Sequence, residues 1–227
     1  MSVHFQCGGY AGARRALLAV AVALAGSRLC CSAEVIDRIV ATVNRHAILK
    51  SEWDEAVGFE CLLNGRALNQ VKPDDRRQTL ERLIDQELIA EQMRSSSFPP
   101  ASREEIAGRV RELRQTVPTW KTDDGWRAAL AGYDLNEGDV EERMAVQVNL
   151  SRYLDLRFRP GIRIEPRAIE NFYYQQLLPE LRRAGAPEPP LKQVTSRIEQ
   201  VLIEQRMNQL QSQWVRTLRL QADIHVR

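Results

Sequence analysis

The sequence predicts a mainly helical protein with a small β-sheet that an early hairpin and the last strand form together. Three observations lead to this prediction: apolar residues recur with helical spacing over most of the chain, an opening segment is rich in β-branched residues, and the closing segment alternates like a strand. Of the 227 residues, 44% are hydrophobic and 27% are charged, which is an ordinary balance for a folded protein.

The first 33 residues are typical of an export signal. Arg14 and Arg15 precede an apolar run from Ala16 to Gly26, and small residues before Glu34 suit a signal peptidase. The run is shorter than the ~20 residues that span a membrane, so we expect cleavage after Ala33 rather than a membrane anchor. Lipidation at Cys30 is the alternative, although an arginine interrupts the small-residue motif before that cysteine.

Removal of this segment leaves 29 basic and 30 acidic residues and a single cysteine, Cys61. A net charge of −1 provides no overall basic field to hold nucleic acid or anionic lipid, so we expect no nucleic-acid partner. No later segment is apolar enough to span a membrane, so we expect no stable membrane insertion. No internal disulfide is then possible, and stability must come from a packed core. Cys61 lies in an amphipathic stretch, which predicts a buried structural thiol.

The first half of the chain predicts a hairpin followed by helices. Residues 35–43 and 47–49 are the two strands, joined by a turn at 44–46. Ser51 and the acids that follow predict the capped start of a helix that ends near Gly65. Capping residues, prolines and a glycine delimit further helices, which we expect over residues 73–95, 102–118 and 126–131.

The second half predicts two long helices. The first covers 136–159 and carries an apolar stripe of Val140, Met144, Val148, Tyr153 and Leu156. Ile162-Arg163-Ile164 then alternates like a brief edge strand, and a helix follows from Glu165-Pro166 to about 179–183. After the linker 184–190, a helical stripe continues for roughly 30 residues, too long to be buried against one neighbour. Residues 222–226 predict the last strand.

The motifs of common enzyme classes are absent from the sequence. It has no phosphate-binding glycine loop, no Gly-x-Ser-x-Gly, no Cys-x-x-Cys and no His-Glu-x-x-His. His46 and His225 are the histidines that follow the signal, and two imidazoles without a third ligand make a poor metal site. We therefore predict no catalytic residue, no metal and no cofactor.

Three segments resemble the periplasmic chaperone SurA and its peptidyl-prolyl isomerase relatives. Residues 35–53 look like the family's entry strand, valine-asparagine turn and capped helix. Residues 164–173 are similar to the helix that precedes its isomerase domain, and residues 190–226 resemble its closing helix and strand. The resemblance implies a helical chaperone domain over 34–183, a closing helix and strand over 191–227 that pack back on it, and a periplasmic location.

The chain departs from this family at one place. In the family a parvulin-type isomerase domain of about 100 residues usually lies between the tyrosine-containing helix and the closing helix, whereas residues 175–190 are too few to form a domain. The Pro-rich linker 184–190 stands in its place. No histidine lies there, so no position matches the parvulin active site, and isomerase activity is doubtful.

The resemblance therefore implies an ATP-independent chaperone that holds unfolded outer-membrane or secreted polypeptides. Candidate client-binding residues are large apolar and aromatic side chains, each of which has ordinary core packing as its alternative role: Trp120, Trp126, Tyr133, Met144, Phe172, Tyr173 and Tyr174. Three consecutive residues cannot share one helix face, so some of residues 172–174 must point outward. Two other functions stay open: a residual prolyl isomerase, and an envelope scaffold or interaction module, such as a homodimer that exchanges its closing helices.

Overall fold

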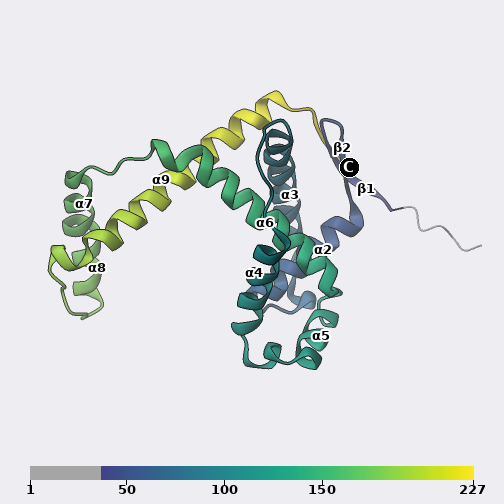
Figure 1. The fold of residues 1–227 in the computed structure, drawn as a ribbon, viewed down its shortest axis with the longest axis horizontal. Coiled ribbons are helices and arrows are strands. Elements are labelled where there is room, and N and C mark those ends of the chain that lie inside the picture. Colours follow the sequence, from purple (N-terminus) through teal and green to yellow (C-terminus); the bar gives the residue numbers. More distant parts are fainter. Residues whose placement is uncertain (1–36) are drawn as a thin grey trace, which may run out of the picture. The chain divides into compact units, whose positions relative to one another are not determined.

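The computed structural model describes residues 37–227, and the predicted export signal with its cleavage at Ala33 lies outside them. As predicted, the protein is mainly helical and has a three-stranded antiparallel sheet (Figure 1). No helix within residues 37–227 is long and apolar enough to cross a membrane. The main elements are β1 (Ile39–Val43), β2 (His46–Leu49), α2 (Lys50–Asn64), α3 (Pro73–Arg94), α4 (Arg103–Gln115), α5 (Asp123–Ala131), α6 (Glu137–Phe158), α7 (Pro166–Phe172), α8 (Leu178–Arg183), α9 (Leu191–Gln221) and β3 (Ile224–Val226).

The sheet joins the two ends of the described chain. Strand β1 lies in the middle, pairs with β2 in a hairpin, and pairs with β3 along its other edge, where Val43 is opposite Ile224. Asn44 in the hairpin turn has a φ of 53°, a left-handed conformation that asparagine tolerates better than most residues. The predicted sheet of an opening hairpin and a closing strand is confirmed.

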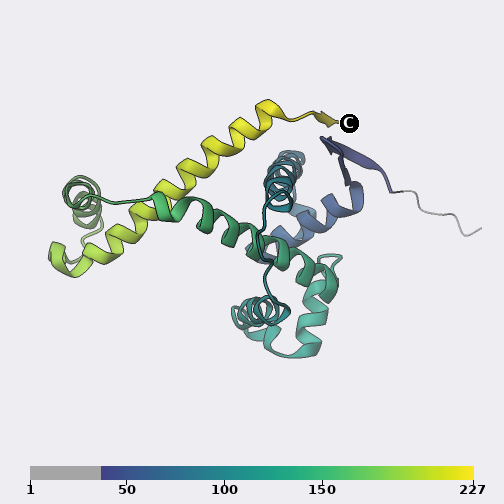
Figure 2. The same ribbon diagram turned by 45° about the horizontal axis from the view of Figure 1, so that its top comes forward.

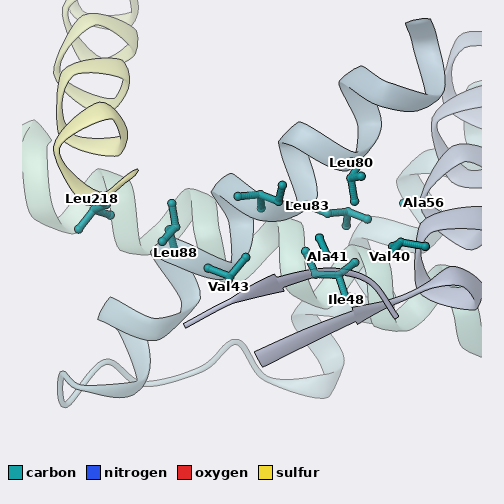
Figure 3. Close-up of a cluster of buried hydrophobic side chains, with 10 residues drawn as sticks. Val40, Ala41, Val43, Ile48, Ala56, Leu80, Leu83, Leu88 and Leu218 are labelled. Atoms are coloured by element: carbon teal, nitrogen blue, oxygen red, sulfur yellow. The ribbon is translucent and has the colours of Figure 1, made fainter. Parts of the chain in front are cut away.

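A first buried cluster fixes this sheet on the helices. Its members come from β1, β2, α2, α3 and α9: Val40, Ala41, Val43, Ile48, Ala56, Leu80, Leu83, Ile84, Leu88 and Leu218. Figure 3 shows Leu88 of α3 between Val43 of β1 and Leu218 of α9. The helix predicted over residues 73–95 thus carries the apolar face that holds the sheet and the end of α9 together.

The start of α2 differs from the prediction, because Ser51 is not its N-cap. The helix begins at Lys50 after Leu49, and Ser51 donates its backbone N–H (3.3 Å) and its hydroxyl to the carboxylate of Asp37. Asp37 precedes β1, so this contact connects the entry of the hairpin to the start of the helix. The helix ends as predicted at Gly65, whose φ of 62° is the left-handed conformation that glycine adopts without strain.

Helices α2, α5 and α6 supply most of a second buried cluster, and α4 packs against it. Ser102 caps α4 as predicted, since its hydroxyl accepts the N–H of Glu105 at 3.2 Å. The prediction that Leu156 lies on the buried stripe of α6 is wrong: Leu156 is 64% exposed, whereas Leu154 is buried. Two residues lie about 200° apart around a helix, so a face that buries Leu154 leaves Leu156 on the solvent side.

The predicted edge strand at Ile162–Ile164 is not formed. The segment between η3 (Arg159–Gly161) and α7 is extended, with φ −91° and ψ 122° at Ile162, but no strand of the described chain lies beside it. The alternation predicted the extended conformation correctly and could not supply a pairing partner.

Helices α7 and α8 are joined by a π-helical turn, η4 (Tyr173–Leu177). Pro179 follows in the first turn of α8. In a regular α-helix, proline lacks the N–H that would bond to the carbonyl four residues earlier, and its ring clashes with that carbonyl. The wider turn moves this carbonyl away and lets the helix continue past Pro179.

Helix α9 is 31 residues long and packs against different neighbours at its two ends (Figures 1 and 2). Near its start, Ile198 is buried against α7 and α8, and near its end Val215 and Leu218 are buried against α6 and α3. Arg219 donates to Asp85 at 2.5 Å and to Glu81 at 2.8 Å, and both acceptors belong to α3. The end of α9 is thus held by polar as well as apolar contacts.

Candidate client-binding surface

The seven candidate residues lie in two separate groups. Trp126 and Met144 are members of the second cluster, and Trp120 and Tyr133 pack against it. Tyr173 is a member of a fourth cluster, formed with Ile169, Leu178 and Ile198, and Phe172 packs against it. The full second cluster is Phe59, Leu62, Trp126, Leu130, Leu135, Val140, Met144 and Val148.

Burial separates these candidates into core and surface residues. Trp126 is 1% exposed, and Met144 and Tyr173 are also buried, so in this conformation they belong to the core. Trp120, Tyr133 and Phe172 are half-buried. Tyr174 is 61% exposed, which agrees with the expectation that some of residues 172–174 point outward. Four of the seven therefore have accessible surface.

Trp120 is held in place by its neighbours. Its ring meets the edge of Trp126 at a centroid distance of 5.7 Å, and the guanidinium of Arg114 lies 5.7 Å from the Trp126 ring. Arg114 also donates to the backbone carbonyl of Trp120 at 3.2 Å and to Asp123 at 2.6 Å. This arginine lowers the pKa of the Asp123 carboxyl, because its hydrogen bond and charge favour the ionised form.

The tyrosine pair connects the helix to the linker. The hydroxyl of Tyr173 donates to the carbonyl of Pro189 at 2.8 Å, and the ring of Tyr174 meets that of Tyr173 at 5.0 Å, edge to face. Arg182 forms an ion pair with Glu188 in the same linker at 2.9 Å. The exposed ring of Tyr174 therefore packs against Tyr173, whose hydroxyl is held by the linker.

The middle of α9 carries apolar surface that no buried cluster covers. Three apolar residues between the two packed ends share one face of the helix, are half-buried, and neither belong to nor pack against the buried clusters of the described chain: Ile203, Met207 and Leu210. We call these three residues the α9 midsection. The half-buried Val201 points away from this face. Periodicity alone predicts an apolar stripe and could not reveal which part of it the clusters leave uncovered.

A group of aromatic residues where α6 meets α9 was also missed. The ring of Trp214 lies 5.7 Å from that of Phe158 and 6.2 Å from that of Tyr153. The guanidinium of Arg157 lies 4.3 Å from the Trp214 ring centroid, within the range of a cation–π contact. The exposed Leu156 lies between Tyr153 and Arg157 on α6. These residues come together only in the fold, because α6 and α9 are far apart in sequence.

The described residues assemble no metal site and no disulfide. Within residues 37–227, no group of three or more His, Cys, Asp or Glu residues could hold a metal ion. His46 lies 3.7 Å from Glu87, and His225 lies 2.9 Å from Asp223, so each imidazole faces a carboxylate. Cys61 is buried, as predicted.

The protein is thus mainly helical, and several of its apolar and aromatic side chains are accessible while they pack against buried clusters. No protein-family model matches the chain, and no curated protein is significantly similar to it. The function is therefore argued from the residues and their arrangement.

Proposed function

We propose that the protein is an ATP-independent periplasmic chaperone that holds unfolded outer-membrane or secreted polypeptides. The observation that carries this proposal is the α9 midsection, a row of accessible apolar side chains between two ends of the helix that are anchored in separate clusters. The resemblance of the opening, tyrosine-helix and closing segments to the SurA-like chaperones supports the same function.

Holding an unfolded chain requires contacts that are weak, numerous and tolerant of sequence. Burial of apolar surface meets this requirement, because it is non-directional and contributes about 25 cal/mol per Å² without a fixed hydrogen-bond pattern. Methionine is well suited to such surfaces because its unbranched side chain adapts to different partners. Met207 lies in the α9 midsection and supplies this chemistry.

The anchored ends explain why this surface stays available. Ile198 fixes the start of α9 in the fourth cluster, while Val215 and Leu218 fix its end. Between them the helix is kept straight by its own backbone hydrogen bonds and needs no neighbour over its middle turns. The half-buried Phe172 and the exposed Tyr174 belong to the α7–η4–α8 segment, which packs on the start of the same α9, and they provide further accessible aromatic surface.

An aggregation assay tests the proposal. Residues 34–227 are added in increasing amount while an unfolded outer-membrane barrel protein is diluted from denaturant, and light scattering is recorded; an unrelated soluble protein such as lysozyme replaces them as the control. We expect scattering to fall at near-stoichiometric protein and to be unchanged by the control. Unchanged scattering with residues 34–227 would refute the holding function and leave the scaffold function to be tested by a pull-down.

Export is tested separately on the full chain. After expression in a Gram-negative host and fractionation, we expect the protein in the periplasmic fraction with Glu34 as its first residue, as measured by intact mass. A mass that includes the first 33 residues, or a lipid-modified amino terminus, would contradict this part of the proposal.

A further inference from the structure

The extended segment at Ile162–Glu165 has backbone groups that nothing in the described chain pairs. At its ends, the N–H of Ile162 donates to Arg159 at 3.1 Å, and the carbonyl of Glu165 accepts from Ala168 at 2.9 Å. Between these bonds, the N–H groups of Arg163 and Ile164 and the carbonyls of residues 162–164 form no hydrogen bond with any other residue of the described range. A short stretch of unpaired extended backbone is the template to which another extended chain can add.

A surface cavity of about 380 Å³ lies beside this segment. Gly161, residues 162–164 and Ala168 line one side, and one face of α9 lines the other, at positions with helical spacing: Leu202, Gln205, Arg206 and Gln209. Ile164 and Leu202 also pack against the fourth cluster, which holds the apolar part of the cavity lining in place. The segment that joins α6 to α7 and the middle of α9 can be followed in Figures 1 and 2.

The lining of this cavity is positively charged. It contains Arg163 and Arg206 and no carboxylate. Neither arginine forms an ion pair within the described chain; Arg206 donates to the amide oxygen of Gln209 at 3.3 Å. Guanidinium groups that lack an acidic partner favour a ligand carboxylate, with which they form charge-assisted hydrogen bonds.

We infer that this groove binds an extended segment of a client polypeptide, which pairs with the backbone of residues 162–164, places an apolar side chain against Ile164 and Leu202, and presents an aspartate or glutamate to Arg163 and Arg206. The inference rests on the proposed holding function and gives it one defined subsite. The three extended residues span about 10 Å, enough to pair with about three residues of a client. Backbone pairing tolerates many sequences, so the subsite is compatible with varied clients, while the two arginines add a preference for acidic segments.

Peptide binding to the protein tests this subsite directly. The probe is a short fluorescein-labelled peptide of alternating valine and threonine with one central aspartate, and the matched peptide has lysine in its place. Fluorescence anisotropy should show at least about tenfold tighter binding of the aspartate peptide. Alternate N–H groups of an extended peptide point to the same edge, so only one of the two sets can pair with residues 162–164. N-methylation of that set should abolish binding, and N-methylation of the other set should leave it unchanged. Equal binding of all these peptides would overturn the inference.

Two variants locate the site. A Cβ at Gly161 would meet no atom within 4 Å, and its backbone is outside the left-handed region, so a side chain can be added there without backbone strain. Gly161 lines the cavity, and we expect the indole of Gly161→Trp to obstruct it and to weaken the aspartate peptide at least about tenfold. The double variant Arg163→Glu/Arg206→Glu should weaken the aspartate peptide at least about tenfold and strengthen the lysine peptide. Arg216→Glu, an exposed position on the same helix outside the cavity, is the matched control and should leave both affinities unchanged. Circular dichroism melts confirm that each variant is folded.

The same variants separate this inference from the proposed function. If the wild-type protein suppresses aggregation and binds the aspartate peptide, and both variants lose the peptide, the subsite and the function stand together. If suppression is present but the variants bind the peptide as tightly as the wild type does, the groove assignment fails and the holding function survives. Peptide binding that depends on Arg163 and Arg206 without any suppression of aggregation would support the subsite and refute the holding function.

Discussion

Asn44 and Asp223 exchange two hydrogen bonds, although 179 positions separate them in sequence. The backbone N–H of Asn44 donates to the carbonyl of Asp223 at 2.7 Å, and the N–H of Asp223 donates to the side-chain oxygen of Asn44 at 2.9 Å. The side-chain amide nitrogen of Asn44 also donates to the carboxylate of Glu91 in α3, at 2.6 Å. One side chain in the hairpin turn thus connects the opening hairpin, α3 and the closing strand.

This arrangement predicts that Asn44 is important for stability. Asn44→Gly keeps the left-handed turn but removes both side-chain hydrogen bonds, so we expect the free energy of unfolding to fall by about 1–2 kcal/mol. Asn44→Ala removes the same bonds and adds the cost of a left-handed backbone at alanine, so it should be less stable than the glycine variant by about 1 kcal/mol. Urea unfolding followed by circular dichroism measures both values.

The order of the two variants is the informative result. If Asn44→Ala is as stable as Asn44→Gly, the turn does not hold the left-handed conformation described here. If neither variant differs from the wild type, the closing strand is held by its backbone pairing with β1 and by the apolar contact of Ile224, without a contribution from the Asn44 side chain.

Local signals in the sequence predicted most helix and strand boundaries. Gly65 and Ser102 delimit helices as expected, because a left-handed glycine and a capping hydroxyl act on the backbone beside them. Ser51 is not the predicted cap because the helix begins one residue earlier, at Lys50, and Ser51 lies inside its first turn, where it donates to the distant Asp37. The strand predicted at Ile162–Ile164 does not form, because a strand needs a pairing partner and a local pattern does not specify one.

The candidate surface was less predictable than the fold. Large residues such as Trp126 and Tyr173 have the same chemistry whether a helix covers them or leaves them exposed, and only tertiary packing decides which. The α9 midsection shows the opposite case, because its apolar residues have helical spacing, yet no buried cluster of the described chain includes them or packs against them. Arg163 and Arg206 line the same cavity because α9 passes beside the segment before α7.

Burial predicts opposite effects for two of the candidate residues. Trp126→Ala should lower the free energy of unfolding by about 3–5 kcal/mol, because it leaves a large cavity in the second cluster. Tyr174→Ala, at a position that is 61% exposed, should change stability by no more than about 0.5 kcal/mol and should weaken the suppression of client aggregation. Thermal melts and light scattering on the same samples measure both properties. A stable Trp126→Ala protein would show that the second cluster is not packed as described.

The α9 midsection predicts a loss of holding without a loss of fold. Met207→Ser/Leu210→Ser makes two half-buried apolar positions polar outside the buried clusters, so we expect the melting temperature to stay close to that of the wild type. The amount of protein needed to suppress aggregation by half should rise several-fold, because less apolar surface is available to the client. Leu220→Ser is the control on the same helix, as Leu220 is 88% exposed near its end. Equal loss of holding in the control would show that the midsection has no special role.

The contact between Asp37 and Ser51 predicts a dependence of stability on pH. The Ser51 hydroxyl, followed by backbone hydrogen bonds, lowers the pKa of the Asp37 carboxyl in the folded protein. Because the unfolded chain then binds the proton more readily, Asp37 stabilises the fold fully above its ordinary pKa of about 3.9, and this contribution is lost as the pH falls through the lower folded value. Asp37→Asn lacks the titrating group, so the wild type should be more stable than this variant by a constant amount between about pH 5 and pH 7, and this difference should shrink below about pH 4. Urea unfolding of both proteins across this range measures the difference, and one that stays constant down to about pH 2 would show that Asp37 does not titrate at a lowered pKa.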